Sequence, residues 1–198
     1  MEETLIFIDA GFLSKLNKHF GNGKYIKFDL FKFCKVLAKK QGLFCKHIFY
    51  YTAPPFQSTP PTTEERKRKE NYDRFISKLS KNKMITIREG RCQRVKNDDG
   101  NFEFYQKGVD TLMTMDLISV PLKFDNIKKV ILIVCDSDFV PVIKRLREIG
   151  IKVILYTYHE KKRKSKFSTS NELMKVVDKV VFLTKEDFLN CPLVEKNN

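Results

Sequence analysis

The sequence predicts an α/β fold built on a doubly wound, largely parallel sheet. Residues 4–9 and 130–134 are short apolar runs without alternation, which is typical of strands buried on both faces of a parallel sheet. Segments with helical periodicity alternate with strand-like segments along most of the chain. An Asp99-Gly100 turn separates two further β-type runs, so we also expect a small β-hairpin.

The elements can be placed in order along the chain. The strand at 4–9 leads into a short helix that reaches Phe20 and ends at Gly21-Asn22-Gly23. Asp29 is a suitable N-cap for a second helix, which stops at Gly42. The remaining expected elements are a strand at 44–52, a charged helix from 62 to about 81, a strand at 84–87, hairpin strands at 91–95 and 102–105, a helix at 109–120, a strand at 130–134, a helix at 139–148, a strand at 153–156, a helix at 171–177 and a strand at 180–182. We expect four or five of these strands to form the central sheet.

Size and composition indicate a single domain over residues 1–198 with an anionic partner. Lys and Arg outnumber Asp and Glu by 38 to 24, which favours RNA or DNA over a membrane surface, although excess lysine also simply keeps a protein soluble. The five cysteines form no C-x-x-C pair, so we expect reduced thiols in a cytoplasmic protein rather than disulfides or a zinc site. No stretch is long enough to cross a membrane, and the N-terminal apolar run is too short for a signal peptide.

Carboxylates follow both buried strands. Asp9 ends the first run, Asp136 and Asp138 follow the second, and Asp110 begins a helix after Lys107-Gly108. Because ligands of open α/β sheets bind beyond the carboxyl ends of the strands, we expect these acids to meet in one crevice. Carboxylates held this close repel one another unless a cation neutralises them. The pattern therefore predicts a divalent metal with a polyanion above it.

Each acid also has a structural explanation to weigh. Asp138 suits the N-cap of the helix that follows it, and Asp9 suits the N-cap of the first helix. Asp136 then has no capping role left, so we assign it to the metal site. Asp110 lies in a first helical turn, where the helix dipole favours an acid in any case. Asp116 falls on the apolar stripe of its helix, which predicts a buried acid that supports the ligands or bonds a backbone end.

The motifs together resemble the NYN domain, in the LabA-like branch of the PIN-type nucleases. The matching residues are Ile8-Asp9, Tyr50-Tyr51, Lys107-Gly108-Val109-Asp110, Asp116-Leu117 and Asp136-Ser137-Asp138-Phe139-Val140-Pro141, followed by Gly150, Ser170, Leu173 and 178–183. The similarity covers a core of about residues 4–184 and leaves a short C-terminal tail. Two positions depart from the family: Phe12 stands where an Asn is usual, and Val134-Cys135 replaces Ser-Gly.

The resemblance implies a three-layer α/β sandwich, PIN-like, that cleaves RNA phosphodiesters with Mg²⁺ or Mn²⁺. Asp9, Asp110, Asp136 and Asp138 would be both the metal ligands and the catalytic residues. Two metals about 4 Å apart are able to clamp the attacking water and the leaving oxygen of a phosphodiester. Candidate phosphate contacts come from three basic sites, each of which is otherwise a solvated surface: Lys107; Arg66, Lys67, Arg68 and Lys69; and Lys161, Lys162 and Arg163.

The function expected is thus a metal-dependent endoribonuclease acting on single-stranded or structured RNA, either as a monomer or as a homodimer. The alternative is a non-catalytic, regulatory RNA-binding NYN module, which would not need all four acids. Toprim-type enzymes need a Glu at an earlier strand end, where this chain has Asp9. Haloacid-type phosphatases need a second Asp where Gly11 stands, and the G-x-G-x-x-G of dinucleotide enzymes is missing after the first strand.

Overall fold

A computed structural model describes residues 1–160, 167 and 170–193 of the chain. Its centre is a six-stranded sheet in the order β3-β2-β1-β6-β7-β8, with every neighbouring pair parallel. The strands are β1 (Glu2–Asp9), β2 (Leu43–Thr52), β3 (Ile85–Glu89), β6 (Lys129–Ile133), β7 (Lys152–Thr157) and β8 (Lys179–Phe182). The expected four or five strands were too few, because the short segments at both edges, β3 and β8, also join the sheet.

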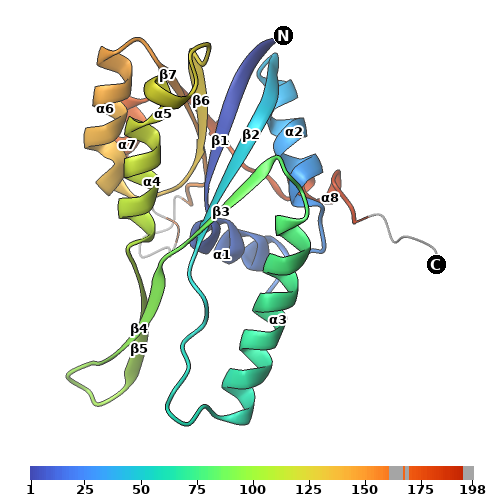
Figure 1. Cartoon of the computed structure of the whole chain (residues 1–198), viewed down its shortest axis with the longest axis vertical. Coiled ribbons are helices and arrows are strands. Elements are labelled where there is room, and N and C mark those ends of the chain that lie inside the picture. The colour runs from blue at the N-terminus through green and yellow to red at the C-terminus, as the bar shows by residue number, and fades with distance from the viewer. Residues whose placement is uncertain (161–166, 168–169, 194–198) are drawn as a thin grey trace.

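Helices cover both faces of this sheet, which confirms the predicted three-layer architecture (Figure 1). The helices are α1 (Ala10–Phe20), α2 (Leu30–Lys40), α3 (Thr63–Ser80), α4 (Val109–Ile118), α5 (Val120–Lys123), α6 (Val140–Glu148), α7 (Asn171–Val176) and α8 (Lys185–Leu189), with a 3₁₀ turn, η1 (Ser137–Phe139), before α6. Helices α5 and α8 had not been expected. Within the described part of the chain, no helix has the length and apolar character needed to span a membrane.

Two hydrophobic clusters explain why the strand sequences are apolar without alternation. In β1, Ile6 and Ile8 pack under α1 and α2, whereas Leu5 and Phe7 pack on the other face under α4 and α6. All four side chains are fully buried. A strand covered by helices on both faces must be apolar at every position, which is the pattern seen at 5–8.

The hairpin and the long helix α3 both project beyond the carboxyl ends of the strands, and in Figure 1 the loop that joins β2 to α3 lies between them. The hairpin consists of the antiparallel strands β4 (Arg91–Lys96) and β5 (Phe102–Lys107). At its base the chain entering β4 passes so close to the chain leaving β5 that a Cβ on Gly90 would lie 2.4 Å from the Lys107 carbonyl oxygen. Glycine is therefore needed at position 90, and it fixes the hairpin against the start of α4.

Candidate metal and nucleic-acid site

The first acid lies where the order of the strands reverses direction. From β1 the chain moves to β2 on one side, and from β6 it moves to β7 on the other. The neighbouring carboxyl ends of β1 and β6 form the switch point at which ligands bind in such sheets. Asp9 ends β1 there, and its Oδ1 accepts hydrogen bonds from Gly11 N at 2.8 Å and Phe12 N at 3.2 Å. Asp9 is thus the N-cap of α1, as its structural explanation predicted.

The prediction that Asp138 caps the turn after β6 is wrong. The cap of the turn after β6 is Asp136 rather than Asp138, since Asp136 Oδ1 accepts from Asp138 N at 3.0 Å. The reason is the short 3₁₀ turn, which begins one residue after Asp136. Asp136 and Asp9 therefore share one arrangement: each follows a neighbouring strand and uses Oδ1 to start the next turn. Among the described hydrogen bonds, none uses the Oδ2 of either acid.

Asp110 reaches the same edge from a different direction. Gly108 is the N-cap of α4 and has φ +81°, a left-handed conformation that glycine adopts without strain. This turn takes the chain from the base of the hairpin into α4, so that Asp110 lies in the first turn of the helix. The Lys-Gly-Val-Asp motif thus has a conformational basis, because the glycine makes the turn that presents the acid.

Desolvation and the charges of neighbouring acids raise the pKa values of Asp9 and Asp110. Desolvation is the largest cause that raises the pKa of Asp9; the charge of Asp136 raises it further, whereas two backbone N–H donors and Lys15 lower it. Desolvation also raises the pKa of Asp110, followed by the charges of Asp9, Asp136 and Asp138. The four residues chosen from the sequence therefore contribute to one region of negative potential at the sheet edge.

The thiol beside these acids is inert. Desolvation, followed by the charges of Asp9 and Asp136, raises the pKa of Cys135 to about 11. A thiol with that pKa is protonated at neutral pH and is a poor nucleophile. The chemistry of this edge therefore belongs to its carboxylates.

The donor set suits a hard divalent cation. Every acid in it offers carboxylate oxygens, the ligands that Mg²⁺ and Mn²⁺ prefer, and Asp9 and Asp136 keep one oxygen each outside their capping bonds. As the side chains stand, no three His, Cys, Asp or Glu residues in the described ranges lie close enough together to hold a metal ion. The chemistry and the mutual repulsion of the acids fit a cation, and the role of the four residues as ligands stays a prediction.

Asp116, further along α4, has strong partners of its own. Its carboxylate accepts from Tyr51 Oη at 3.0 Å and from Arg88 Nε and Nη2, both at 2.9 Å, and Lys123 Nζ lies 3.7 Å away. This buried acid therefore joins α4 to β2 and β3 through side chains rather than through a backbone end. Its support of the other acids stays a prediction.

A groove of about 820 Å³ opens between α1, α3 and the base of the hairpin; Ala10 and Gly11, which follow Asp9, line it, whereas none of the four acids is among its described lining residues. Its lining includes Gly11 and Lys15 of α1, Tyr25 and Lys27, Arg68 and Tyr72 of α3, and Cys92 and Gln106 of the hairpin. Gly11 and Lys15 are four residues apart and therefore lie on the same face of α1. This spacing is the signal by which the position of Lys15 beside the start of α1 could have been predicted. Gln106 had no such signal, because its position depends on how the hairpin packs.

Of the basic residues predicted to contact phosphates, Arg68 is the one among the described residues that lines the groove. Lys69 instead pairs with Asp73 at 2.6 Å, and Arg66 donates to the Pro61 carbonyl at 2.9 Å. Lys67 and Lys107 are exposed. The other predicted contacts, Lys161, Lys162 and Arg163, lie outside the described residues.

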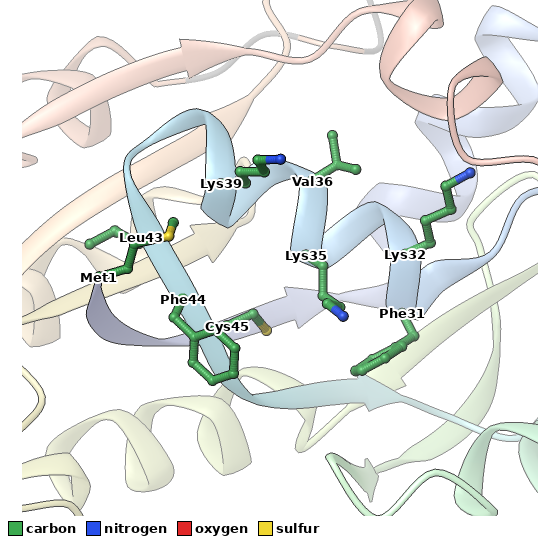
Figure 2. A pocket seen from close by; sticks show the side chains of 9 residues that line it. All are labelled: Met1, Phe31, Lys32, Lys35, Val36, Lys39, Leu43, Phe44 and Cys45. Atoms are coloured by element: carbon green, nitrogen blue, oxygen red, sulfur yellow. The ribbon is translucent and has the colours of Figure 1, made fainter.

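A second hollow, of about 380 Å³, lies beside α2 and the first residues of β2 (Figure 2). Lysines surround its rim, and Lys35 Nζ is 5.2 Å from the centre of the Phe31 ring. No carboxylate lines it, and it adjoins the start of a strand rather than the end. It has none of the chemistry found at the switch point.

Comparison with known proteins identifies the family and the fold. The model of the NYN domain matches residues 3–184. No curated protein matches the chain. The crystal structure of a protein of unknown function from Vibrio parahaemolyticus is similar in fold, with a TM-score of 0.57 and 16% identity over 94% of this chain and 95% of that one. The chain therefore belongs to the NYN domain family, which is part of the PIN-like nuclease superfamily.

Proposed function

We propose that this protein is a divalent-metal-dependent endoribonuclease of the LabA-like branch. Asp9, Asp110, Asp136 and Asp138 would hold Mg²⁺ or Mn²⁺ at the switch point. The bound cation would supply an activated water and stabilise the charge that develops on the phosphate. RNA is the expected partner in a cytoplasmic setting, and homodimer formation remains a separate prediction.

One observation supports this proposal: besides desolvation, the charges of Asp9, Asp136 and Asp138 raise the pKa of Asp110, although these acids come from three separate segments of an NYN domain. Capping alone does not explain the set, since Asp110 lies within a helix whose cap is Gly108. Concentrating negative charge on a chain of net charge +14 is useful if a cation binds there and an anionic strand follows.

The chain's own residues would then position the substrate. Lys15, whose charge lowers the pKa of Asp9, stands at the edge of the groove, where it is able to contact a phosphate. Arg68 lines the opposite wall on α3. These two cations would hold the strand across the groove while the acids face the scissile bond.

A second candidate rests on Phe12. The side chain that replaces the usual Asn is only 4% exposed and packs in the core under α1, so it offers no polar group to the site. A domain that has lost this group fits a non-catalytic module that binds RNA without cutting it. The two candidates differ in turnover and agree in binding.

The test measures cleavage of end-labelled RNA, both unstructured and stem-loop, with Mn²⁺, with Mg²⁺ and with EDTA. Cleavage should require metal and should fall by about 10³-fold or more in Asp136→Asn. Because Asn caps as well as Asp, this variant should stay folded. Asp125→Asn is the matched control, since it removes an exposed acid from the turn before β6, at the other end of that strand.

The outcomes separate the two candidates. Metal-dependent cleavage that is lost in Asp136→Asn and kept in Asp125→Asn supports the nuclease. Cleavage at the wild-type rate by a folded Asp136→Asn protein would refute the site. RNA binding by the wild type without any cleavage in Mn²⁺ would favour the non-catalytic module.

A further inference from the structure

One face of the hairpin continues the groove away from the acids. Side chains alternate between the two faces of a hairpin, and directly paired residues share a face. The pairs on the groove face are Cys92–Gln106, Arg94–Phe104 and Lys96–Phe102. The first of these pairs lines the groove itself. The other two therefore extend the same surface toward the tip.

The aromatic residues on this face have no role in the core. Phe102 is 53% exposed and Phe104 is 51% exposed. Neither hydrophobic cluster of the described residues includes a hairpin side chain. Large aromatic side chains left open on a two-stranded arm indicate contact with something outside the chain.

Two phenylalanine rings, those of Phe102 and Phe56, lie against the guanidinium of Arg94. Arg94 Cζ lies 4.3 Å from the centre of the Phe102 ring and 4.8 Å from that of Phe56, on the loop after β2. The rings of Phe56 and Phe104 are 5.6 Å apart. The surface is thus a row of flat groups, aromatic and guanidinium, within stacking distance of one another.

The charge of the face selects an anion. Its cations are Arg94 and Lys96, while Glu103, the acid within the paired strands, lies on the opposite face with Tyr105. Flat groups combined with positive charge are the features with which proteins bind unpaired nucleotides: bases stack on the rings and phosphates pair with the cations.

The base of the hairpin also lies close to Asp9. Gln106 Oε1 and Asp9 Oδ1 both lie 3.1 Å from the position that a Cβ on Gly11 would occupy. From Phe102 to Gln106 the strand rises by roughly 14 Å, which is the length of about four nucleotides in a stacked strand. A strand lying on this face would therefore end at the switch point.

We propose that the Arg94 face of the hairpin, together with Phe56, is a base-stacking site for unpaired RNA nucleotides next to the bond to be cut. The identity of the strand as RNA rests on the proposed function. The site requires unpaired bases, because bases within a duplex already stack on each other and cannot lie on protein side chains.

The experiment measures binding in EDTA, where no cleavage takes place, by the fluorescence anisotropy of a labelled, unstructured oligouridylate. The double variant Phe102→Ala/Phe104→Ala should weaken binding about tenfold or more, because each stacked base contributes strongly to affinity. Phe102→Tyr/Phe104→Tyr keeps the rings and should bind like the wild type. Tyr105→Ala is the matched control, since it removes a 45% exposed ring from the opposite face of the same strand.

A second readout tests stacking directly. A 2-aminopurine base in the oligonucleotide should lose fluorescence on binding to the wild type and keep it with the double alanine variant. The proposal is overturned if that variant binds as tightly as the wild type, if Tyr105→Ala weakens binding equally, or if an RNA duplex binds as well as the single strand. Cleavage is not part of this test. A wild type that binds as described but never cuts would refute the proposed nuclease and leave the stacking site intact.

Discussion

The carboxyl edge of the sheet and the hairpin arm are built from opposite kinds of sequence. At the edge, Asp9 and Asp136 follow strands whose side chains are almost all buried, so packing on both faces sets where the acids lie. In the arm, nearly every side chain is exposed and no core holds it. The proposed reactive groups therefore stand on the tightly packed part of the molecule, whereas the proposed strand-binding groups stand on the part whose sequence is least constrained by packing.

The largest effect that we expect is a loss of stability when a substitution creates a cavity in the core beneath the carboxyl edge. Leu132→Ala empties a fully buried position in β6 and should lower the free energy of unfolding by about 2–5 kcal/mol. Phe104→Ala removes a larger side chain from the arm and should change it by less than about 0.5 kcal/mol. Urea unfolding of both variants measures the difference. Equal losses would mean that the arm is part of the cooperative core.

The next effect tests the junction of the two regions. In Gly90→Ala the new methyl group would meet the Lys107 carbonyl oxygen, so the hairpin must shift relative to α4 and Asp110. A displacement of that kind should lower RNA cleavage by about 10²-fold. Gly150→Ala is the control: it strains a turn with φ +84° far from the acids and should leave cleavage unchanged. Normal cleavage by Gly90→Ala would show that the arm and the acids are positioned independently.

A smaller effect concerns the repulsion at the edge. Desolvation and three neighbouring acids raise the pKa of Asp110 in the folded protein. The fold therefore loses stability as the pH rises from the pKa of a free Asp to this raised pKa, and the loss is complete above it. Without metal at neutral pH, Asp110→Asn should therefore melt at a higher temperature than the wild type. The two curves should converge as the pH falls toward about 4, the value of a free Asp.

Added Mn²⁺ should raise the melting temperature of the wild type more than that of Asp110→Asn, because the cation relieves the same repulsion. Differential scanning fluorimetry over a pH series, with and without Mn²⁺, follows both effects. A lower melting temperature for the variant at every pH would assign Asp110 a stabilising role instead.

The smallest effect distinguishes two neighbouring cations of α3. Arg68 lines the groove and Lys67 does not. Arg68→Ala should flatten the salt dependence of single-stranded RNA binding by roughly 0.7 in log–log slope, the value for one phosphate contact. Lys67→Ala should leave the slope unchanged. Equal slopes for the two variants would mean that α3 contributes only a general positive potential.

The buried edge could be predicted from the sequence because its signals are local. The apolar runs at 5–8 and 130–134 require a strand covered on both faces, and an acid at the end of such a strand falls at the carboxyl edge. Gly108 is also a local signal, because the turn before α4 needs a positive φ, which glycine adopts without strain. The α/β class, the parallel sheet, the hairpin and the family all followed from signals of this kind.

What could not be predicted depends on contacts between distant segments. Whether Asp136 or Asp138 caps the turn depends on where the 3₁₀ turn begins, and the two alternatives differ by two residues. The alignment of Arg68 with the groove, and of Gln106 with Asp9, depends on how the arm and α3 pack across the carboxyl edge. No periodicity in either segment contains that information.

The hairpin enters and leaves the core at one point, since Arg91 pairs with Lys107 and Gly90 lies against the same carbonyl. The hairpin is therefore inserted into the chain like a loop, because its two ends lie side by side and it pairs with no strand of the central sheet in the described residues. We expect that residues 93–105 can be exchanged, lengthened or shortened without altering the strand order, whereas Gln106 at the base lies beside Asp9 and Gly11. If the proposed function holds, the sheet would carry the groups that break the bond, and the hairpin, which can vary independently of the strand order, would carry the groups that select the strand.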